Sequence, residues 1–417
     1  MQVIAYHSDD VSVPVKEACM DFLATICTKS KTAKTEISVA NETSACIEIA
    51  CGCILSHSKR ITDIPQLAST GDLLDSIVDT PKDTDAIEID DINLVLSCLS
   101  FLSSITRVKS TRKLIIQDLN LKESLSTILE NTPSYAVKYA VNYFCATLAR
   151  YISDFDQEGS RYSIPILSSM LLKCFTTQRA RHKPTESTSL LYGNFSKIHN
   201  CNDNLVLATA CSAFEHMLPY MSTELVDEVL ITLSSKFSEM VKYEMRTAKR
   251  VAMKTRNSGL LASNLVLFLF LCSVRSEYKT SLRKQQIISD LMCLILLNPG
   301  DNLSEGKKDN EDDIRVLRIE KTNWNCGVMY CLQCLATLSI ELDDVHSWDE
   351  IISSVELEVQ QTVKFRRSNR TIGTSTSKET MPSNSLLETL NKFIGDSVDS
   401  GSSIAAKKII ENLDLGL

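Results

Sequence analysis

The tetrapeptide Asn-Leu-Val-Leu occurs three times in this chain, and each copy is predicted to open a long apolar run with helical spacing. The copies begin at Asn93, Asn204 and Asn264. Apolar side chains that recur every three or four residues lie on one face of an α-helix, and such a helix is stable when another element covers that face. The chain is therefore predicted to fold as helices packed on one another.

Composition supports an all-α fold. The 417 residues include only 12 glycines and 9 prolines, whereas average proteins contain about 7% and 5% of these residues. Sandwiches, barrels and α/β folds need many glycine-dependent turns, which are scarce here. Few segments alternate strictly between apolar and polar residues, as half-buried strands do. The length allows two or three globular domains, or one elongated array in which each unit contacts its neighbours.

Apolar spacing and polar gaps predict the organisation of the chain. Five regions are expected: N-terminal helical repeats at 1–176, a loop at 177–203, C-terminal helical repeats at 204–365 with an acidic loop at 298–313, a disordered linker at 366–384, and short C-terminal helices at 385–417. A further loop is expected at 80–91. Helices are predicted near 15–29, 41–57, 90–107, 111–130, 134–152, 163–176, 203–219, 223–256, 259–275, 280–297, 314–341, 347–365 and 385–394.

Two segments resemble the second helix of HEAT and armadillo repeats, in which an apolar and a basic residue precede a small residue and then a large apolar one. They are Val15, Lys16, Ala18, Phe22 and Leu23 after Asp10 and Pro14, and Val137, Lys138, Ala140 and Phe144 after Pro133. The resemblance implies an α-solenoid whose extended surface binds other macromolecules, and it implies no catalytic activity. The three tetrapeptides are unevenly spaced, so the number of repeats stays open, and a non-repetitive helical bundle is the alternative.

One charge pattern predicts a binding site. The net charge of −8 argues against a nucleic-acid-binding protein. Within the predicted helix 223–256, basic residues at helical spacing form a stripe opposite apolar Phe237, Met240 and Val241. This basic ridge consists of Lys242, Arg246, Lys249, Arg250 and Lys254. It is predicted to bind an acidic or phosphorylated protein partner, and the plain alternative is a solvated helix face.

No familiar catalytic motif is present in the sequence, so no enzyme activity and no cofactor are expected. The patterns GxxxxGK[ST], GxGxxG, HExxH and GxSxG are absent. Cys326, Cys331, Cys334 and His346 are the best candidates for zinc ligands. Cys331 and Cys334 lie on the apolar face of a predicted helix, however, so a place in the core is favoured over a metal site. The other cysteines also occur in apolar runs and are expected to be buried thiols.

These observations predict a non-catalytic intracellular scaffold that binds a protein partner. Two alternatives remain: a chaperone or regulatory subunit of a larger complex, and a membrane-associated helical protein. The apolar run Gly259–Val274 is shorter than the ~20 residues that span a membrane, which argues against the last. Met1–Asp10 lacks the pattern of a secretory signal, so a cytoplasmic or nuclear location is expected. The oligomeric state is not predicted.

Overall fold

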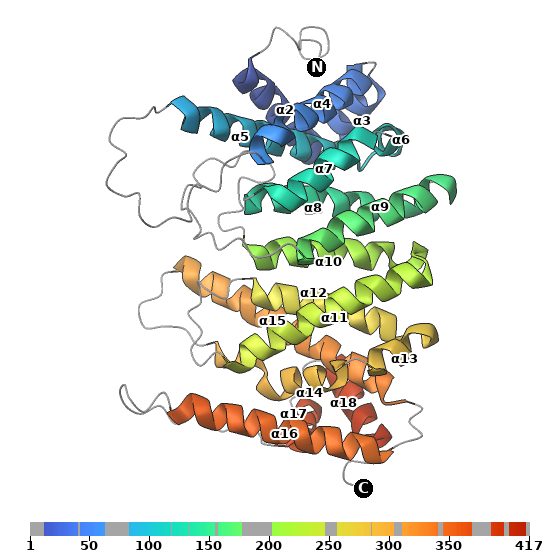
Figure 1. Cartoon of the computed structure of the whole chain (residues 1–417), viewed down its shortest axis with the longest axis vertical. Coiled ribbons are helices and arrows are strands. Elements are labelled where there is room, and N and C mark those ends of the chain that lie inside the picture. Colours follow the sequence, from blue (N-terminus) through green and yellow to red (C-terminus); the bar gives the residue numbers. More distant parts are fainter. Residues whose placement is uncertain are drawn as a thin grey trace. The chain divides into compact units, whose positions relative to one another are not determined.

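Helices are the only regular elements in the part of the chain that the structure describes, which confirms the all-α prediction. The computed structural model describes residues 12–40, 42–62, 83–117, 119–132, 134–154, 157–176, 202–246, 257–284, 286–303, 311–340, 345–368, 385–395 and 400–413. The chain divides into two compact units, Met1–Ser222 and Thr223–Leu417 (Figure 1). Residues 177–201 of the predicted loop, 304–310 of the acidic loop predicted at 298–313 and 369–384 of the linker predicted at 366–384 lie outside the described residues. The other parts of the last two predictions are wrong in part, because 299–302, 311–313 and 366–368 are helical.

Short helices separate pairs of longer helices in the first unit. The elements are α2 (Val13–Lys29), α3 (Lys31–Val39), α4 (Glu42–Thr62), α5 (Asp83–Ile105), α6 (Lys109–Gln117), α7 (Leu119–Asn131), α8 (Tyr135–Ala149), η1 (Ile152–Asp154), α9 (Gln157–Thr176), α10 (Asp203–Met217) and η3 (Leu218–Tyr220). Polar side chains start several of them, because a side-chain oxygen satisfies an amide that lacks an intrahelical partner. Ser30, Ser134 and Asn202 each accept a hydrogen bond from the amide three residues later.

Two rows of helices form the first unit. Helices α2, α5, α8 and α10 pack one against the next and are here named the long row. Helices α4, α7 and α9 pack in succession in the same way and form the second row. Between consecutive long-row helices the chain passes through a short helix and then a second-row helix. Figure 1 shows α7, α8, α9 and α10 following one another down this unit.

Neighbouring long-row helices of the first unit run in the same direction. Asn142 of α8 donates a hydrogen bond to the carbonyl oxygen of Val206 in α10 at 2.9 Å. Arg150, directly after α8, donates one to His216 near the end of α10 at 3.2 Å. Because the contacts advance together along both helices, α8 and α10 are parallel. A hydrogen bond likewise joins the C-terminal ends of α2 and α5.

The second unit also contains a long row, formed by α12, α15 and α18, and a second row, formed by α11, α14 and α16. Helix α17 packs on α14 and α18. The elements are α11 (Thr223–Arg246), α12 (Ser258–Ser273), α13 (Ser276–Lys284), α14 (Ile287–Leu297), η4 (Pro299–Asn302), α15 (Glu311–Leu338), α16 (Val345–Ser368), α17 (Leu386–Gly395) and α18 (Ser400–Asn412).

Helices α12 and α15 approach closely at glycines. A Cβ atom added to Gly259 would lie 2.9 Å from the carbonyl oxygen of Glu320 and 2.9 Å from Cδ1 of Trp324. Further along, a Cβ atom on Gly327 would lie 3.5 Å from the amide nitrogen of Ser263. These contacts advance in the same direction along both helices, so α12 and α15 are parallel. The missing side chains allow the two backbones to pack against each other.

Charged side chains cap helix ends in the second unit. The buried carboxylate of Glu320 accepts hydrogen bonds from the Ser258 hydroxyl at 2.9 Å and the Gly259 amide at 2.6 Å, at the start of α12. Arg283 donates to the carbonyl oxygen of Leu338 at 3.0 Å, at the end of α15. An anion at a helix N-terminus and a cation at a helix C-terminus both stabilise the helix through its dipole.

Several predicted boundaries are wrong. The helices expected at 111–130 and 280–297 are each two helices, α6 with α7 and α13 with α14. The apolar spacing continues across each break, which hides the change of direction. The loop expected at 80–91 contains the start of α5, and α3 was not predicted because Lys31–Val39 has few apolar residues.

The Asn-Leu-Val-Leu tetrapeptide does not mark helix starts consistently. Asn204 lies in the first turn of α10, as predicted, whereas Asn93 and Asn264 lie inside α5 and α12. The valine is buried in all three copies. The first leucine is buried at Leu94 and Leu265 and half-buried at Leu205. The tetrapeptide is therefore a core pattern of long-row helices.

Burial of the cysteines agrees with the sequence interpretation. All described cysteines carry free thiols, and all except Cys19 and Cys326 are buried. Burial disfavours the thiolate and raises the pKa of Cys145 to about 12. Such thiols are poor nucleophiles and serve as small apolar side chains in the core.

Candidate partner-binding site

Helix α11 carries the part of the basic ridge that the structure describes. Lys242 is exposed, whereas Phe237, Met240 and Val241 are buried, so the two predicted faces of this stretch are confirmed. The helix was expected to continue to residue 256, and its described part ends at Arg246. The side chain of Arg246 and all of Lys249, Arg250 and Lys254 lie outside the described residues.

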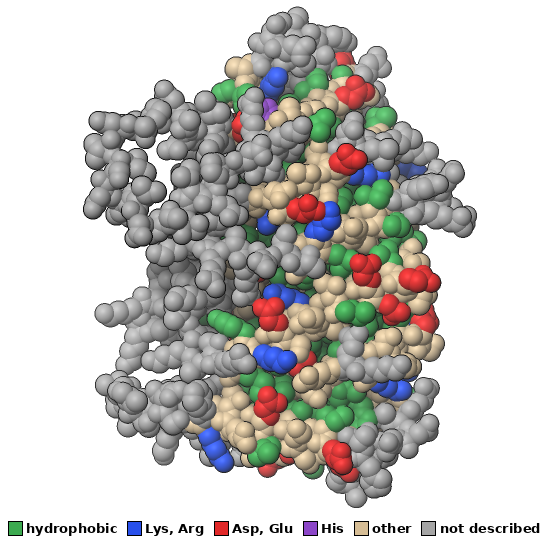
Figure 2. All heavy atoms as spheres, viewed as in Figure 1, with side chains coloured by type: hydrophobic (Ala, Val, Ile, Leu, Met, Phe, Trp, Pro, Cys, Tyr) green, Lys and Arg blue, Asp and Glu red, His purple; other side chains and the backbone are tan. Residues whose placement is uncertain are grey.

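The exposed edge of α11 before Lys242 is acidic and apolar. Glu224, Glu228 and Glu239 are exposed on this edge, and the side chain of Ile231 is 60% exposed. Lys236 forms an ion pair with Glu239 at 2.9 Å. In the view of Figure 2, basic, acidic and apolar side chains are interspersed over the described surface. A basic surface on α11 can therefore begin only at Lys242.

Lys242 also acts on a buried carboxyl group of the same unit. Asp290 of α14 is 4% exposed, and its burial raises its pKa. A hydrogen bond with Ser238 and the positive charge of Lys242 oppose this rise, whereas the negative charge of Glu358 adds to it. Lys242 thus stabilises the charged form of Asp290 between α11, α14 and α16, a structural role that the sequence did not suggest.

A second polar cluster lies at the C-terminal ends of α8 and α10 in the first unit. Burial raises the pKa of Glu215 to about 8, although the nearby Arg150 guanidinium lowers it. Burial and the charge of Arg150 both lower the pKa of His216. At neutral pH the cluster therefore contains a charged arginine, a largely protonated carboxyl and a largely neutral imidazole. Sequence reasoning missed it, because Arg150 and His216 are far apart in the chain.

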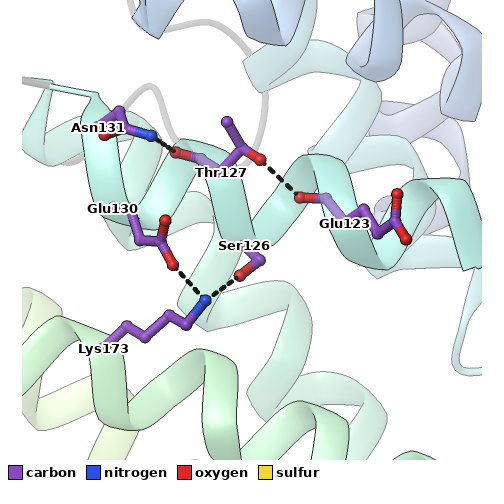
Figure 3. A network of polar contacts seen from close by, with 6 residues as sticks. All are labelled: Glu123, Ser126, Thr127, Glu130, Asn131 and Lys173. Atoms are coloured by element: carbon purple, nitrogen blue, oxygen red, sulfur yellow. Dashed lines mark hydrogen bonds and ion pairs between the residues drawn. The ribbon is translucent and has the colours of Figure 1, made fainter.

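Polar contacts also join second-row helices α7 and α9 (Figure 3). The ammonium group of Lys173 donates a hydrogen bond to Ser126 Oγ at 2.8 Å and forms an ion pair with Glu130. Lys173 and Glu130 are 38% and 39% exposed, so solvent screens the pair. Thr127 and Asn131 make hydrogen bonds within α7. These contacts tie one turn of α9 to α7, which fits a contact between helices.

His57 and Asp91 form a buried pair between α4 and α5. The distance from Nδ1 of His57 to Oδ1 of Asp91 is 2.5 Å, and the residues are 9% and 4% exposed. Both side chains are enclosed by the core of the first unit, so the pair fixes how the two helices meet.

Two of the four zinc candidates belong to the core of α15, whereas Cys326 in the same helix is half-buried. Cys331 and Cys334 are buried, and burial raises the pKa of Cys334 to about 12. The side chain of His346 lies outside the described residues. Within the described ranges, no group of three histidine, cysteine, aspartate or glutamate side chains has an arrangement that fits a metal ion.

No single helix among those that the structure describes has the length and apolarity of a membrane span, while the bent pair Lys31–Ile37 and Glu42–His57 meets these requirements by length and composition.

No protein-family model, curated protein or solved structure matches the chain.

Proposed function

We propose that this chain is a non-catalytic scaffold of the armadillo or HEAT type, which holds a macromolecular partner on an extended helical surface. The observation that carries the proposal is the parallel packing of long-row helices that are separated in sequence by a short helix and a second-row helix. This order recurs from α2 to α5, from α5 to α8 and from α12 to α15. A unit of two or three helices that is repeated by stacking is typical of these repeats.

The chemistry of the described side chains supports a binding role over catalysis. Most of the thiols are buried, with raised pKa values, and the His57 imidazole is enclosed with Asp91. The long helices instead expose large apolar side chains to solvent, including Phe22 at 62%, Ile231 at 60% and Leu357 at 56%. Exposed apolar groups beside charged ones are common in surfaces that bind proteins.

The basic ridge of Lys242, Arg246, Lys249, Arg250 and Lys254 is the proposed anchor for an acidic or phosphorylated protein partner in the cytoplasm or nucleus. Positive side chains on one helix face attract such a partner and speed its association, most strongly at low salt. Because Lys242 also stabilises Asp290, a test of the ridge must leave Lys242 unchanged.

Affinity purification of the tagged full chain, followed by mass spectrometry, tests this function. The ridge variant Arg246→Glu/Lys249→Glu/Lys254→Glu is compared with a control of equal charge change, Lys321→Glu/Lys407→Glu/Lys408→Glu, at exposed positions of the same unit. We expect one stoichiometric partner protein with the original chain and the control, and its loss with the ridge variant. Recovery of the chain alone would contradict the scaffold, and equal recovery with both variants would contradict the ridge.

A further inference from the structure

The C-terminal ends of the four long-row helices in the first unit form a continuous edge. Parallel packing places these ends side by side, and side chains at the ends, or in the short helix α6 that follows α5, join each end to the next. The contacts are the hydrogen bond between Thr28 and Ser104 at 3.0 Å, the Arg112 guanidinium 4.4 Å from the centre of the Tyr151 ring, and the hydrogen bond from Arg150 to His216 at 3.2 Å. Figure 1 shows α3 and α6, which follow two of these ends, on the same side of the unit.

Exposed cations occur at three successive ends along this edge. They are Lys29 and Lys31 after α2, Lys109 and Arg107 after α5, and Arg150 after α8. We name these five residues the basic edge. None of the four cations after α2 and α5 forms an ion pair with another described residue. Their charges therefore face solvent.

Helix stability does not account for all of these cations. A cation at a helix C-terminus is favourable, which explains Lys29. Lys31 and Lys109, however, are the first residues of α3 and α6, where the positive end of the helix dipole disfavours a cation. Neither helix has an acidic residue in its first turn. Lys31 and Lys109 therefore gain nothing from the dipoles of the helices that they begin.

Among the described side chains, few carboxylates lie beside the basic edge. Glu215, at the end of α10, is largely protonated at neutral pH because burial raises its pKa. Glu36 is exposed, but it lies more than one turn after Lys31 in α3, and Glu42 is half-buried at the start of α4. The described side chains of the edge therefore carry an excess of positive charge on a chain whose net charge is −8.

We propose that the basic edge binds an extended acidic peptide segment. Packed helices lie about 8–10 Å apart, and an extended peptide rises about 3.3 Å per residue. The spacing of carboxylates at every third residue of the peptide, about 10 Å, therefore matches the spacing of successive helix ends. The negative net charge of the chain disfavours a long polyanion such as nucleic acid. The inference rests on the proposed scaffold function but concerns the first unit, so it is independent of the ridge on α11.

Fluorescence anisotropy with synthetic probes tests the proposal directly. The first probe is a labelled peptide of glycine and serine with glutamate at every third position, and the second has the same composition with its glutamates in one block. A single-stranded oligonucleotide of equal charge is the third. Arg107→Glu/Lys109→Glu is compared with the control Lys407→Glu/Lys408→Glu, which changes the net charge equally at exposed positions of the second unit. Circular dichroism confirms that both variants are folded.

We expect the spaced peptide to bind more tightly than the block peptide and the oligonucleotide, and to lose affinity as salt is raised. The edge variant should bind it at least about tenfold more weakly, which corresponds to ~1.4 kcal/mol, while the control changes affinity less than about twofold. Equal losses in both variants, or tighter binding of the oligonucleotide, would overturn the proposal. These outcomes are separate from the affinity purification, because a partner recovered through the ridge would leave the edge result unchanged.

Discussion

In the first unit, parallel long-row helices are joined by side-chain hydrogen bonds, whereas in the second unit the helices α12 and α15 are joined by backbone contact at glycines. Asn142 is fully buried and reaches across to the Val206 carbonyl. Gly259 and Gly327 instead remove side chains from the interface. A side-chain hydrogen bond in the first unit and close backbone contact in the second therefore both join parallel helices. A single sequence motif therefore cannot mark both contacts.

The largest predicted effect comes from filling the glycine contact. Gly259→Ala should lower the free energy of unfolding by about 2–3 kcal/mol, because the new Cβ would collide with the backbone of α15. Hydrogen exchange should show lost protection in α12 and α15 while α8 and α10 stay protected. The control is Gly52→Ala in α4, where an added Cβ meets nothing within 4 Å. This control should raise stability by up to about 1 kcal/mol. Equal effects of both substitutions would contradict the close approach.

The second-largest effect is predicted for the hydrogen bond that joins α8 and α10 in the first unit. Asn142→Leu should destabilise the protein by about 2 kcal/mol in urea unfolding, because it removes a buried bridge from α8 to α10. The loss of hydrogen-exchange protection should fall on α8 and α10 and spare α12 and α15. Asn131→Leu, at an exposed position, should change stability by less than about 0.5 kcal/mol. No difference between the two variants would show that the bridge contributes nothing.

A pH-dependent effect is predicted for Glu215. Its pKa is raised in the folded state, so its stabilising contribution is complete below the unfolded value near 4.5 and is lost as the pH rises to about 8. The free energy of unfolding should therefore fall between pH 6.5 and 8, and Glu215→Gln should remove about 1 kcal/mol of that fall. Chemical denaturation at several pH values measures it. An unchanged pH profile in the variant would refute the raised pKa.

The smallest effect is expected at the contact between α7 and α9. Lys173→Met should change the free energy of unfolding by less than about 1 kcal/mol, because the ion pair with Glu130 is partly exposed. Added salt should reduce the difference further, as measured by urea unfolding in low and high salt. A loss of several kcal/mol that persists in high salt would mean that this pair is a core contact of the second row.

The sequence predicted the helical class, most of the long helices and the faces of α11, because these depend on local apolar spacing. It could not predict the breaks after Gln117 and Lys284, since the spacing continues through them. Contacts such as Arg150 with His216 and Lys242 with Asp290 depend on how distant helices pack. The basic ridge was found from charge spacing alone, whereas the role of Lys242 beside a buried carboxyl required the structure.

The basic edge was missed for a related reason. Each of its cations is an ordinary residue in an unremarkable turn, and no two of the three helix ends are close in sequence. Only the parallel direction of α2, α5 and α8 places the ends together. A sequence pattern records the spacing within one helix, but it does not record the direction of the helix beside it.

Cross-linking mass spectrometry with a short lysine-reactive reagent tests the parallel packing of long-row helices most directly. The measurement uses the native chain, in which Lys29 and Lys31 lie at the end of α2, Lys16 near its start, and Lys109 just after α5. Parallel packing predicts intramolecular links from Lys109 to Lys29 or Lys31. Links from Lys109 to Lys16, without links to Lys29 or Lys31, would contradict it.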